Sequence, residues 1–348
     1  MAQLQFLLLA GHCGYAKRQV PRMSRLPCGR TNRPLCRATA QMGQTGLQAL
    51  RDGSSRLTEV VLAFDADNYL GETPIWSAAD QALWWVNCEN PPELHRWDPV
   101  SGGHAKWDMP QRIGGFVHKP DGGLLVALAD GLYDFTPADG ALALRVKSGL
   151  PATVKLHECH CDRAGRFWIG GYDHAFPANR DATGASWFRL DGDTLTPVIP
   201  GIAVANGLAF SPDGRTMYAA DSPKRTVMAY DLDPATGDVS NSRTFLALGD
   251  GEAFVDGATV DSEGGYWLAN VGAGALRRYL PDGTLDRIVP LPFSNPTKPA
   301  FGGADLKTLY VTSTKMAMPA TMTPTMENGG IFALRPGETG VAETPLAG

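Results

Sequence analysis

The sequence predicts an all-β fold, a single six-bladed β-propeller, from three observations. Its 40 Gly, 26 Pro and eight Trp are typical of short strands joined by tight turns. A pattern of apolar alternation followed by a polar turn recurs six times along the chain. The copies are spaced by about the length of one four-stranded blade.

Each copy contains an apolar alternation, a turn and a second strand rich in Trp, Tyr or Leu. The copies begin at Glu72, Gly114, His157, Asn206, Asp256 and Thr297. Successive starts are 42, 43, 49, 50 and 41 residues apart. The turns read SAADQA, KPDGG, DRAGR, SPDGR, DSEGG and GADLK, and Asp, Gly and Pro favour chain reversal. Six copies therefore predict six blades.

Residues 57–348 are predicted to form the propeller. The alternating stretch 57–64, LTEVVLAF, precedes the first complete copy. We expect it to pair as the outer strand of the last blade, because this closure protects the sheet edges. The Trp residues of the second strands are expected to pack between blades. They are Trp84, Trp85, Trp168 and Trp267.

Residues 1–56 are expected to be an N-terminal extension outside the propeller. Residues 1–50 contain seven Lys and Arg but no Asp or Glu, a composition that resembles a transit peptide. A disordered extension, or a native start at Met42, is the preferred interpretation. The apolar run 4–10 is too short to span a bilayer.

The charge balance points to a small-molecule ligand. A formal net charge of -5 argues against a nucleic-acid partner, which requires a concentrated basic face. No segment predicts a membrane anchor. Six irregularly spaced cysteines favour a reducing compartment over a disulfide scaffold. We therefore expect a cytoplasmic monomer or weak homo-oligomer.

Polar residues occupy the position at which each copy begins. In a propeller the first strand of every blade lines the central channel, so equivalent positions converge. Glu72, His157, Asn206 and Asp256 share this position, and Glu158 follows His157. Burying two carboxylates together is costly unless a cation compensates them. Asn-Gly and Asp-Gly can also serve only as turns, but turns have no reason to share a repeat position with Glu72 and His157.

The shared first positions of the six copies form a ring around the channel, which we call the ring positions. Their polar residues predict a site for one divalent cation. Glu72, Asn206 and Asp256 supply oxygen donors, which suit Ca, Mg or Mn. A nitrogen of His157 would instead favour Zn or Fe. The identity of the metal is therefore open at this stage.

Five segments carry a resemblance to a known family, namely LGETPIW, CDRAGRFWIGG, NGLAFSPDGRTMYAADS, VDGATVDSEGGYWLA and PAFGGADLKTLYVTS. On these motifs the chain resembles the family of senescence marker protein 30 (regucalcin), gluconolactonase and related sugar lactonases, over about residues 57–340. The resemblance implies a six-bladed propeller and hydrolysis of a sugar lactone. It also implies a divalent cation held by Glu72, Asn206 and Asp256.

The motif of the third blade departs from the family pattern. The family usually carries Arg-x-Asn-Asp-Gly there, which contributes substrate contacts, whereas this chain has KLHEC at 155–159. By position, Lys155, His157 and Glu158 are expected to contact the substrate. The replacements remain polar, so we expect a site with altered substrate and metal preference. Lys155 can donate to a sugar hydroxyl, but it lacks the bidentate fork of Arg.

The resulting hypothesis is a metal-dependent lactonase that produces an aldonic acid. The metal polarises the lactone, and Asp256 acts as general base for the attacking water. A phosphotriesterase or other esterase is an alternative, since the fold alone does not separate these activities. A non-catalytic interaction or metal-binding propeller is another, and it predicts an uncharged ring. A serine hydrolase is disfavoured because the chain has no Gly-x-Ser-x-Gly motif.

Overall fold

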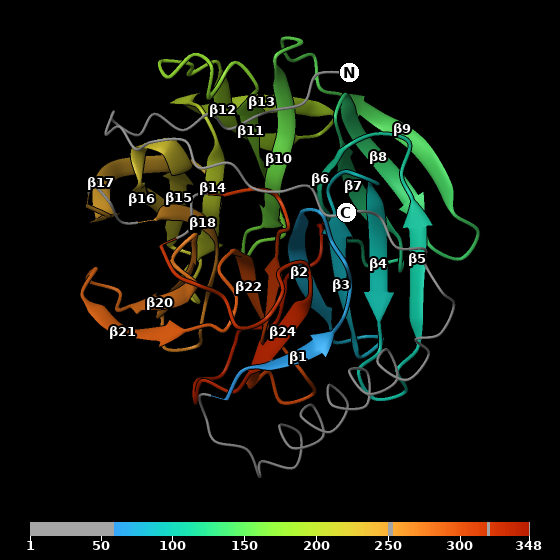
Figure 1. Ribbon diagram of the computed structural model, residues 1–348. Helices are drawn as coiled ribbons and strands as arrows, with labels where there is room; N and C mark the ends of the chain where they lie inside the picture. Colours follow the sequence, from blue (N-terminus) through green and yellow to red (C-terminus); the bar gives the residue numbers. More distant parts are fainter. Residues whose placement is uncertain (1–58, 250–252, 319–320, 348) are drawn as a thin grey trace, which may run out of the picture.

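The computed structural model describes residues 59–249, 253–318 and 321–347. These residues form six four-stranded antiparallel sheets arranged around a central axis (Figure 1). The six-bladed β-propeller is therefore confirmed. The predicted extension, residues 1–56, lies outside the described residues. Nowhere in the described ranges is a helix long and apolar enough to cross a membrane.

The first five blades each contain four consecutive strands, ordered from the axis outward. Blade 1 contains β2 (Gly71–Ser77), β3 (Ala82–Asn87), β4 (Glu93–Trp97) and β5 (His104–Asp108). Blade 2 contains β6 (Ile113–His118), β7 (Leu124–Leu128), β8 (Gly131–Thr136) and β9 (Ala141–Lys147). Blade 3 contains β10 (Val154–Cys161), β11 (Phe167–Asp173), β12 (Ala185–Asp191) and β13 (Thr194–Ile202).

The remaining blades complete the ring. Blade 4 contains β14 (Ala205–Phe210), β15 (Thr216–Asp221), β16 (Thr226–Leu232) and β17 (Val239–Ala247), with a short 3-10 helix, η1 (Ser222–Lys224), after β15. Blade 5 contains β18 (Phe254–Val260), β19 (Tyr266–Val271), β20 (Ala275–Tyr279) and β21 (Leu285–Pro290). Blade 6 contains β22 (Pro296–Gly302), β23 (Thr308–Ser313), β24 (Ile331–Leu334) and β1 (Val61–Phe64).

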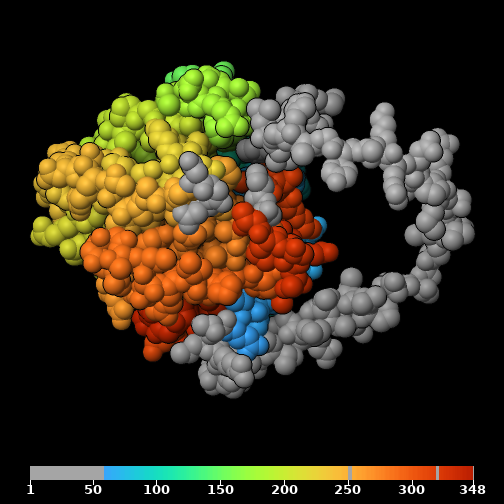
Figure 2. Space-filling model, turned by 60° about the vertical axis from the view of Figure 1, so that its left-hand side comes forward, coloured from blue at the N-terminus to red at the C-terminus, as the bar shows by residue number. Residues whose placement is uncertain are grey.

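Blade 6 is built from both ends of the described chain. Strand β1 pairs antiparallel with β24, with Leu62 opposite Phe332. This is the outer strand that the alternation of residues 57–64 predicts. Figure 2 shows the blue residues of this segment lying against the orange and red C-terminal part of the molecule. The pairing closes the ring, so the position of every inner strand is fixed from both sides.

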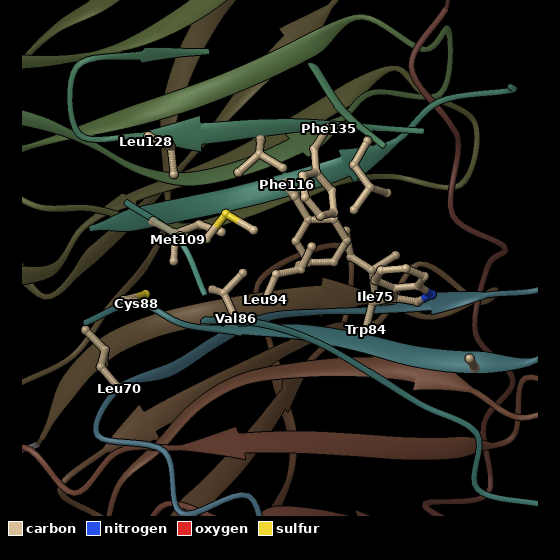
Figure 3. Close-up of a cluster of buried hydrophobic side chains, with 14 residues drawn as sticks. Leu70, Ile75, Trp84, Val86, Cys88, Leu94, Met109, Phe116, Leu128 and Phe135 are labelled. Atoms are coloured by element: carbon tan, nitrogen blue, oxygen red, sulfur yellow. The ribbon is translucent and has the colours of Figure 1, made fainter. Parts of the chain in front are cut away.

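Apolar side chains fill the space between neighbouring blades. Figure 3 shows Ile75 and Trp84 of blade 1 on one side of such a cluster, and Phe116 and Phe135 of blade 2 on the other. The tryptophans that were expected to pack between blades are all buried in these clusters, namely Trp84, Trp85, Trp168 and Trp267. This packing leaves the inner strands little freedom to move relative to one another.

Every inner strand is irregular near the predicted ring position. The pairing with the second strand shifts between Glu72 and Ile75 in blade 1, for example, and between Asn206 and Ala209 in blade 4. The other four blades show a corresponding shift. A shift of this kind bends the strand and changes the direction of its side chains. It occurs where side chains must turn toward the axis.

The C-terminal segment, residues 339–347, crosses the end of the channel at which the turns between the first and second strands of the blades lie. The Gly340 N–H donates to the Leu306 carbonyl at 2.7 Å, and the Ala347 N–H donates to the Gly165 carbonyl at 2.8 Å. The segment thereby joins blade 6 to blade 3. Between these contacts the Glu343 carboxyl group forms a hydrogen bond with Nε2 of His160 on β10. The channel is therefore occupied at this end by side chains of the protein.

A buried Asp ties the first hairpin of blade 5 together. Asp261 accepts hydrogen bonds from Trp267 Nε1 and Arg278 Nε, both at 2.8 Å. Asp162 does the same in blade 3 with Trp168 Nε1 and Arg166 Nε, at 3.1 and 2.8 Å. These carboxylates link the turn after the inner strand to the second strand.

We expect Asp261→Ala to lower the free energy of unfolding by about 2 to 4 kcal/mol, because the buried N–H groups of Trp267 and Arg278 both lose their acceptor. The Arg278 side chain is only 4% exposed. Asp213→Ala, in the exposed turn of blade 4, is the matched control and should cost about 1 kcal/mol or less. Denaturant unfolding measures both variants. Equal losses would contradict this role of Asp261.

Candidate active site

The charge of Glu72 acts on Asp256, and Asn206 is linked through Ser222 to Val255, the residue before Asp256. Glu72 lies on β2, Asn206 on β14 and Asp256 on β18, and each is less than 10% exposed. Burial, reinforced by the charge of Glu158, raises the pKa of Glu72 to about 8. Burial, reinforced by the charges of Glu72 and Glu158, raises the pKa of Asp256 well above its ordinary value. The structure thus places carboxyl groups close together in a dry site, where their charged forms are disfavoured.

A hydrogen bond orients the amide of Asn206. Its Nδ2 donates to the Ser222 hydroxyl at 2.8 Å, and that hydroxyl donates to the Val255 carbonyl at 2.7 Å. The amide nitrogen is thereby used within the protein. The Oδ1 atom accepts no hydrogen bond from any described residue. Asn206 therefore offers an oxygen, which is the donor atom that hard cations prefer.

A buried lysine that the sequence reasoning missed lies in the same cluster. Lys298 of β22 places its Nζ 2.6 Å from Glu158 Oε1. The other oxygen of Glu158 accepts the Leu208 N–H at 3.0 Å. The two oxygens of Glu158 are thus bound by two other blades, blade 6 through Lys298 and blade 4 through Leu208. One signal pointed to Lys298, since it follows the ring position of the sixth copy as Glu158 follows that of the third.

The remaining charges fit a divalent cation. Lys298 is paired with Glu158, and neither Glu72 nor Asp256 forms an ion pair with a described residue. When both are ionised they leave two negative charges, which one divalent cation would balance. No three His, Cys, Asp or Glu side chains of the described ranges are grouped to hold a metal. The donor set therefore depends on the oxygen of Asn206 as well as on the two carboxylates.

Arg112 is a second residue that the sequence reasoning missed. It precedes β6 and reaches across to blade 3. One terminal nitrogen donates to the Leu156 carbonyl at 3.0 Å, and the other lies 3.0 Å from His157 Nδ1. Burial, followed by the charge of Arg112, holds the pKa of His157 well below its ordinary value. His157 is therefore neutral, and its Nδ1 is already engaged.

The blade 3 side of the site carries further donors. The ring of Tyr172 lies 5.8 Å from that of His157 and stacks on His174 at 4.2 Å, both between ring centroids. Lys155 is the cross-strand neighbour of Tyr172 and is half-buried. Burial, then the charges of Arg112 and Lys155, lowers the pKa of His174 to about 4. Lys155 and His157 thus both lie beside Tyr172.

The other two ring positions have structural roles. The Thr297 hydroxyl donates to the Gly71 carbonyl and also bonds the Thr312 hydroxyl. Gly114 lies against blade 3, where a Cβ would meet the Leu156 carbonyl oxygen at 2.5 Å. Thr297 therefore joins blades 6 and 1, and Gly114 allows blades 2 and 3 to approach closely.

The chain matches the family model described as SMP-30/Gluconolactonase/LRE-like region over residues 70–315. It is 35% identical to 6-deoxy-6-sulfogluconolactonase of Pseudomonas putida, over 80% of this chain and 95% of that protein. It is 33% identical to L-arabinolactonase of Azospirillum brasilense, over 83% of this chain and 96% of that protein.

Solved structures show the same likeness. A luciferin-regenerating enzyme superposes with a TM-score of 0.75 at 25% identity, covering 81% of this chain and 96% of that one. The calcium-binding protein regucalcin of Agrobacterium tumefaciens superposes with a TM-score of 0.72 at 28% identity, covering 81% and 95%. Since the family model spans five blades and part of the sixth, the chain belongs to the SMP-30/gluconolactonase/LRE-like family.

Proposed function

We propose that the chain is a metal-dependent hydrolase that opens a sugar lactone to the aldonic acid. The observation that carries this proposal is the pair of buried carboxylates, Glu72 and Asp256, beside the free amide oxygen of Asn206. A third carboxylate, that of Glu158, is already paired with the ammonium group of Lys298. Relatives that bear the names of sugar lactonases support a lactone as the substrate class.

Glu72, Asn206 and Asp256 would hold the cation. When bound, it supplies Lewis-acid polarisation of the lactone carbonyl. We favour Ca, Mg or Mn, because the three donors are oxygens. The Nδ1 atom of His157, which would favour Zn or Fe, is engaged by Arg112.

Asp256 acts as the general base. One of its oxygens takes a proton from the attacking water, whose oxygen forms a bond to the carbonyl carbon of the lactone. The ring C–O bond breaks, and the ring oxygen receives that proton and becomes a hydroxyl.

Two residues of the blade 3 motif bind the substrate in this proposal. The closeness of His157 and Lys155 to the same ring, that of Tyr172, supports this, and both can donate to sugar oxygens. Glu158 was also expected to contact the substrate. Because both of its oxygens are bound within the protein, we assign it to charge balance with Lys298 instead.

Chelation, Asp256→Asn and Glu72→Gln should each remove lactone hydrolysis. We expect kcat/KM of Asp256→Asn to fall by about 10²- to 10⁴-fold, the usual contribution of a general base. Acid release from gluconolactone and arabinonolactone measures this, with Asp213→Asn as the exposed control. Undiminished turnover after chelation and in both variants would contradict the proposal. Faster turnover of an aryl phosphotriester would favour the esterase alternative.

Removing the carboxylate of Glu72 should stabilise the metal-free protein. The pKa of Glu72 rises from 4.5 to about 8 on folding, so stability is lost as the pH rises through this range. In chelator at pH 8, Glu72→Gln should raise the free energy of unfolding by roughly 2 to 4 kcal/mol. With excess cation the order should reverse, because only the wild type gains from binding. Urea titrations with and without chelator test this, and a less stable Glu72→Gln protein in chelator would contradict it.

The ion pair between Lys298 and Glu158 can be tested separately. Lys298→Met leaves the Glu158 carboxylate buried without the ammonium group that balances it. We expect the free energy of unfolding to fall by about 3 to 5 kcal/mol. Adding Glu158→Gln should recover most of this loss, because the two substitutions act on one interaction. Additive losses in the double variant, measured by urea unfolding, would show that the two residues do not balance each other.

A further inference from the structure

We propose that Arg112 is a positioning residue that holds His157 in the tautomer with its proton on Nε2. His157 thereby presents Nε2–H as a fixed donor to an oxygen of the substrate. The tautomer follows from the contacts of Arg112 alone. The identity of the acceptor, an oxygen of a sugar lactone, rests on the proposed function.

The hydrogen bond between Arg112 and His157 can have only one direction. A terminal nitrogen of Arg112 lies 3.0 Å from His157 Nδ1. A guanidinium group has five N–H donors and no acceptor. Nδ1 must therefore be the acceptor, and a neutral imidazole that accepts at Nδ1 carries its proton on Nε2.

Arg112 is itself held in place. Its other terminal nitrogen donates to the Leu156 carbonyl at 3.0 Å, so the guanidinium bonds two consecutive residues of β10. Its Nε lies 3.9 Å from Glu89 Oε2, and its side chain is only 11% exposed. Gly114, two residues further along, lets the backbones of blades 2 and 3 approach closely enough for this reach. The contact is therefore built into the packing of two blades.

The Nε2 atom of His157 makes no hydrogen bond with a described residue. It is also not one of the fully buried polar atoms that have no partner. It therefore keeps contact with solvent although the residue as a whole is buried. The ring of Tyr172 packs beside the imidazole. The free N–H is thus available to a ligand that enters the channel.

The arrangement has a chemical consequence. The positive charge of Arg112 beside Nδ1 disfavours a second proton, so His157 stays a neutral donor. A donor fixed in advance stabilises negative charge that develops on a substrate oxygen without reorganising during the reaction. In this tautomer neither ring nitrogen offers a free lone pair to a metal. The same contact that makes His157 a donor therefore keeps it out of the metal ligand set.

Nuclear magnetic resonance on protein with isotope-labelled histidine tests the tautomer directly. The His157 signals are assigned by their loss in His157→Asn. We expect an unprotonated Nδ1 and a protonated Nε2 from about pH 6 to pH 8, the range in which a free histidine titrates. In Arg112→Met the signals should change to a mixture of tautomers. A protonated Nδ1 in the wild type, or an unchanged spectrum in Arg112→Met, would overturn the proposal.

Arg163→Met is the matched control. Arg163 also donates to backbone carbonyls of a neighbouring blade, those of Phe210 and Ser211, but it lies at the other end of β10. It should leave the His157 signals unchanged. A change as large as that in Arg112→Met would show a general loss of packing and overturn the proposal.

Kinetics on the same variants separate this proposal from the proposed function. We expect Arg112→Met to lower kcat for a lactone by about ten- to a hundred-fold with little change in KM, the scale for misplacing one transition-state donor. Equal rates of lactone hydrolysis by the wild type and by Arg112→Met would overturn the positioning role of Arg112 and leave the proposed function intact. If the wild type hydrolyses no lactone, the proposed function fails, and the spectra still decide the tautomer.

Discussion

The site depends on the balance of charge around one axis. Three carboxylates, Glu72, Asp256 and Glu158, are buried where the inner strands meet. The protein compensates one of them itself through Lys298. In our account the other two are balanced by a divalent cation, because two uncompensated anions in a dry site are costly. The same pair that strains the metal-free protein thus provides the binding energy for the cation.

The propeller makes this crowding possible because no blade supplies the site alone. The residues that we propose hold the cation come from blades 1, 4 and 5, the Lys298 ammonium group comes from blade 6, and the donors Arg112, Lys155 and His157 come from blades 2 and 3. The ring is closed by β1 and β24, and the spaces between blades are filled with apolar side chains. The distances between the polar groups are therefore fixed by the whole ring.

Repeat analysis could predict the fold and the ring, because periodicity alone places Glu72, Asn206 and Asp256 at one position of the inner strands. The repeat position marks Lys298 only by analogy with Glu158, and it could not predict that Lys298 pairs with Glu158 or that Arg112 bonds His157. Lys298 lies one residue after the ring position, and its direction depends on the local irregularity of β22. Arg112 lies two residues before that position, and its target is set by how closely blades 2 and 3 approach. Both facts are properties of packing, which a linear pattern does not contain.

Titration calorimetry of the chelator-treated protein with Ca, Mg and Mn tests the central claim most directly. The account predicts that at least one of these cations binds the wild type in a single equivalent, and that the same cation does not bind Asn206→Leu or Asp256→Asn measurably. Absence of binding to the wild type, or unaltered binding to both variants, would contradict it.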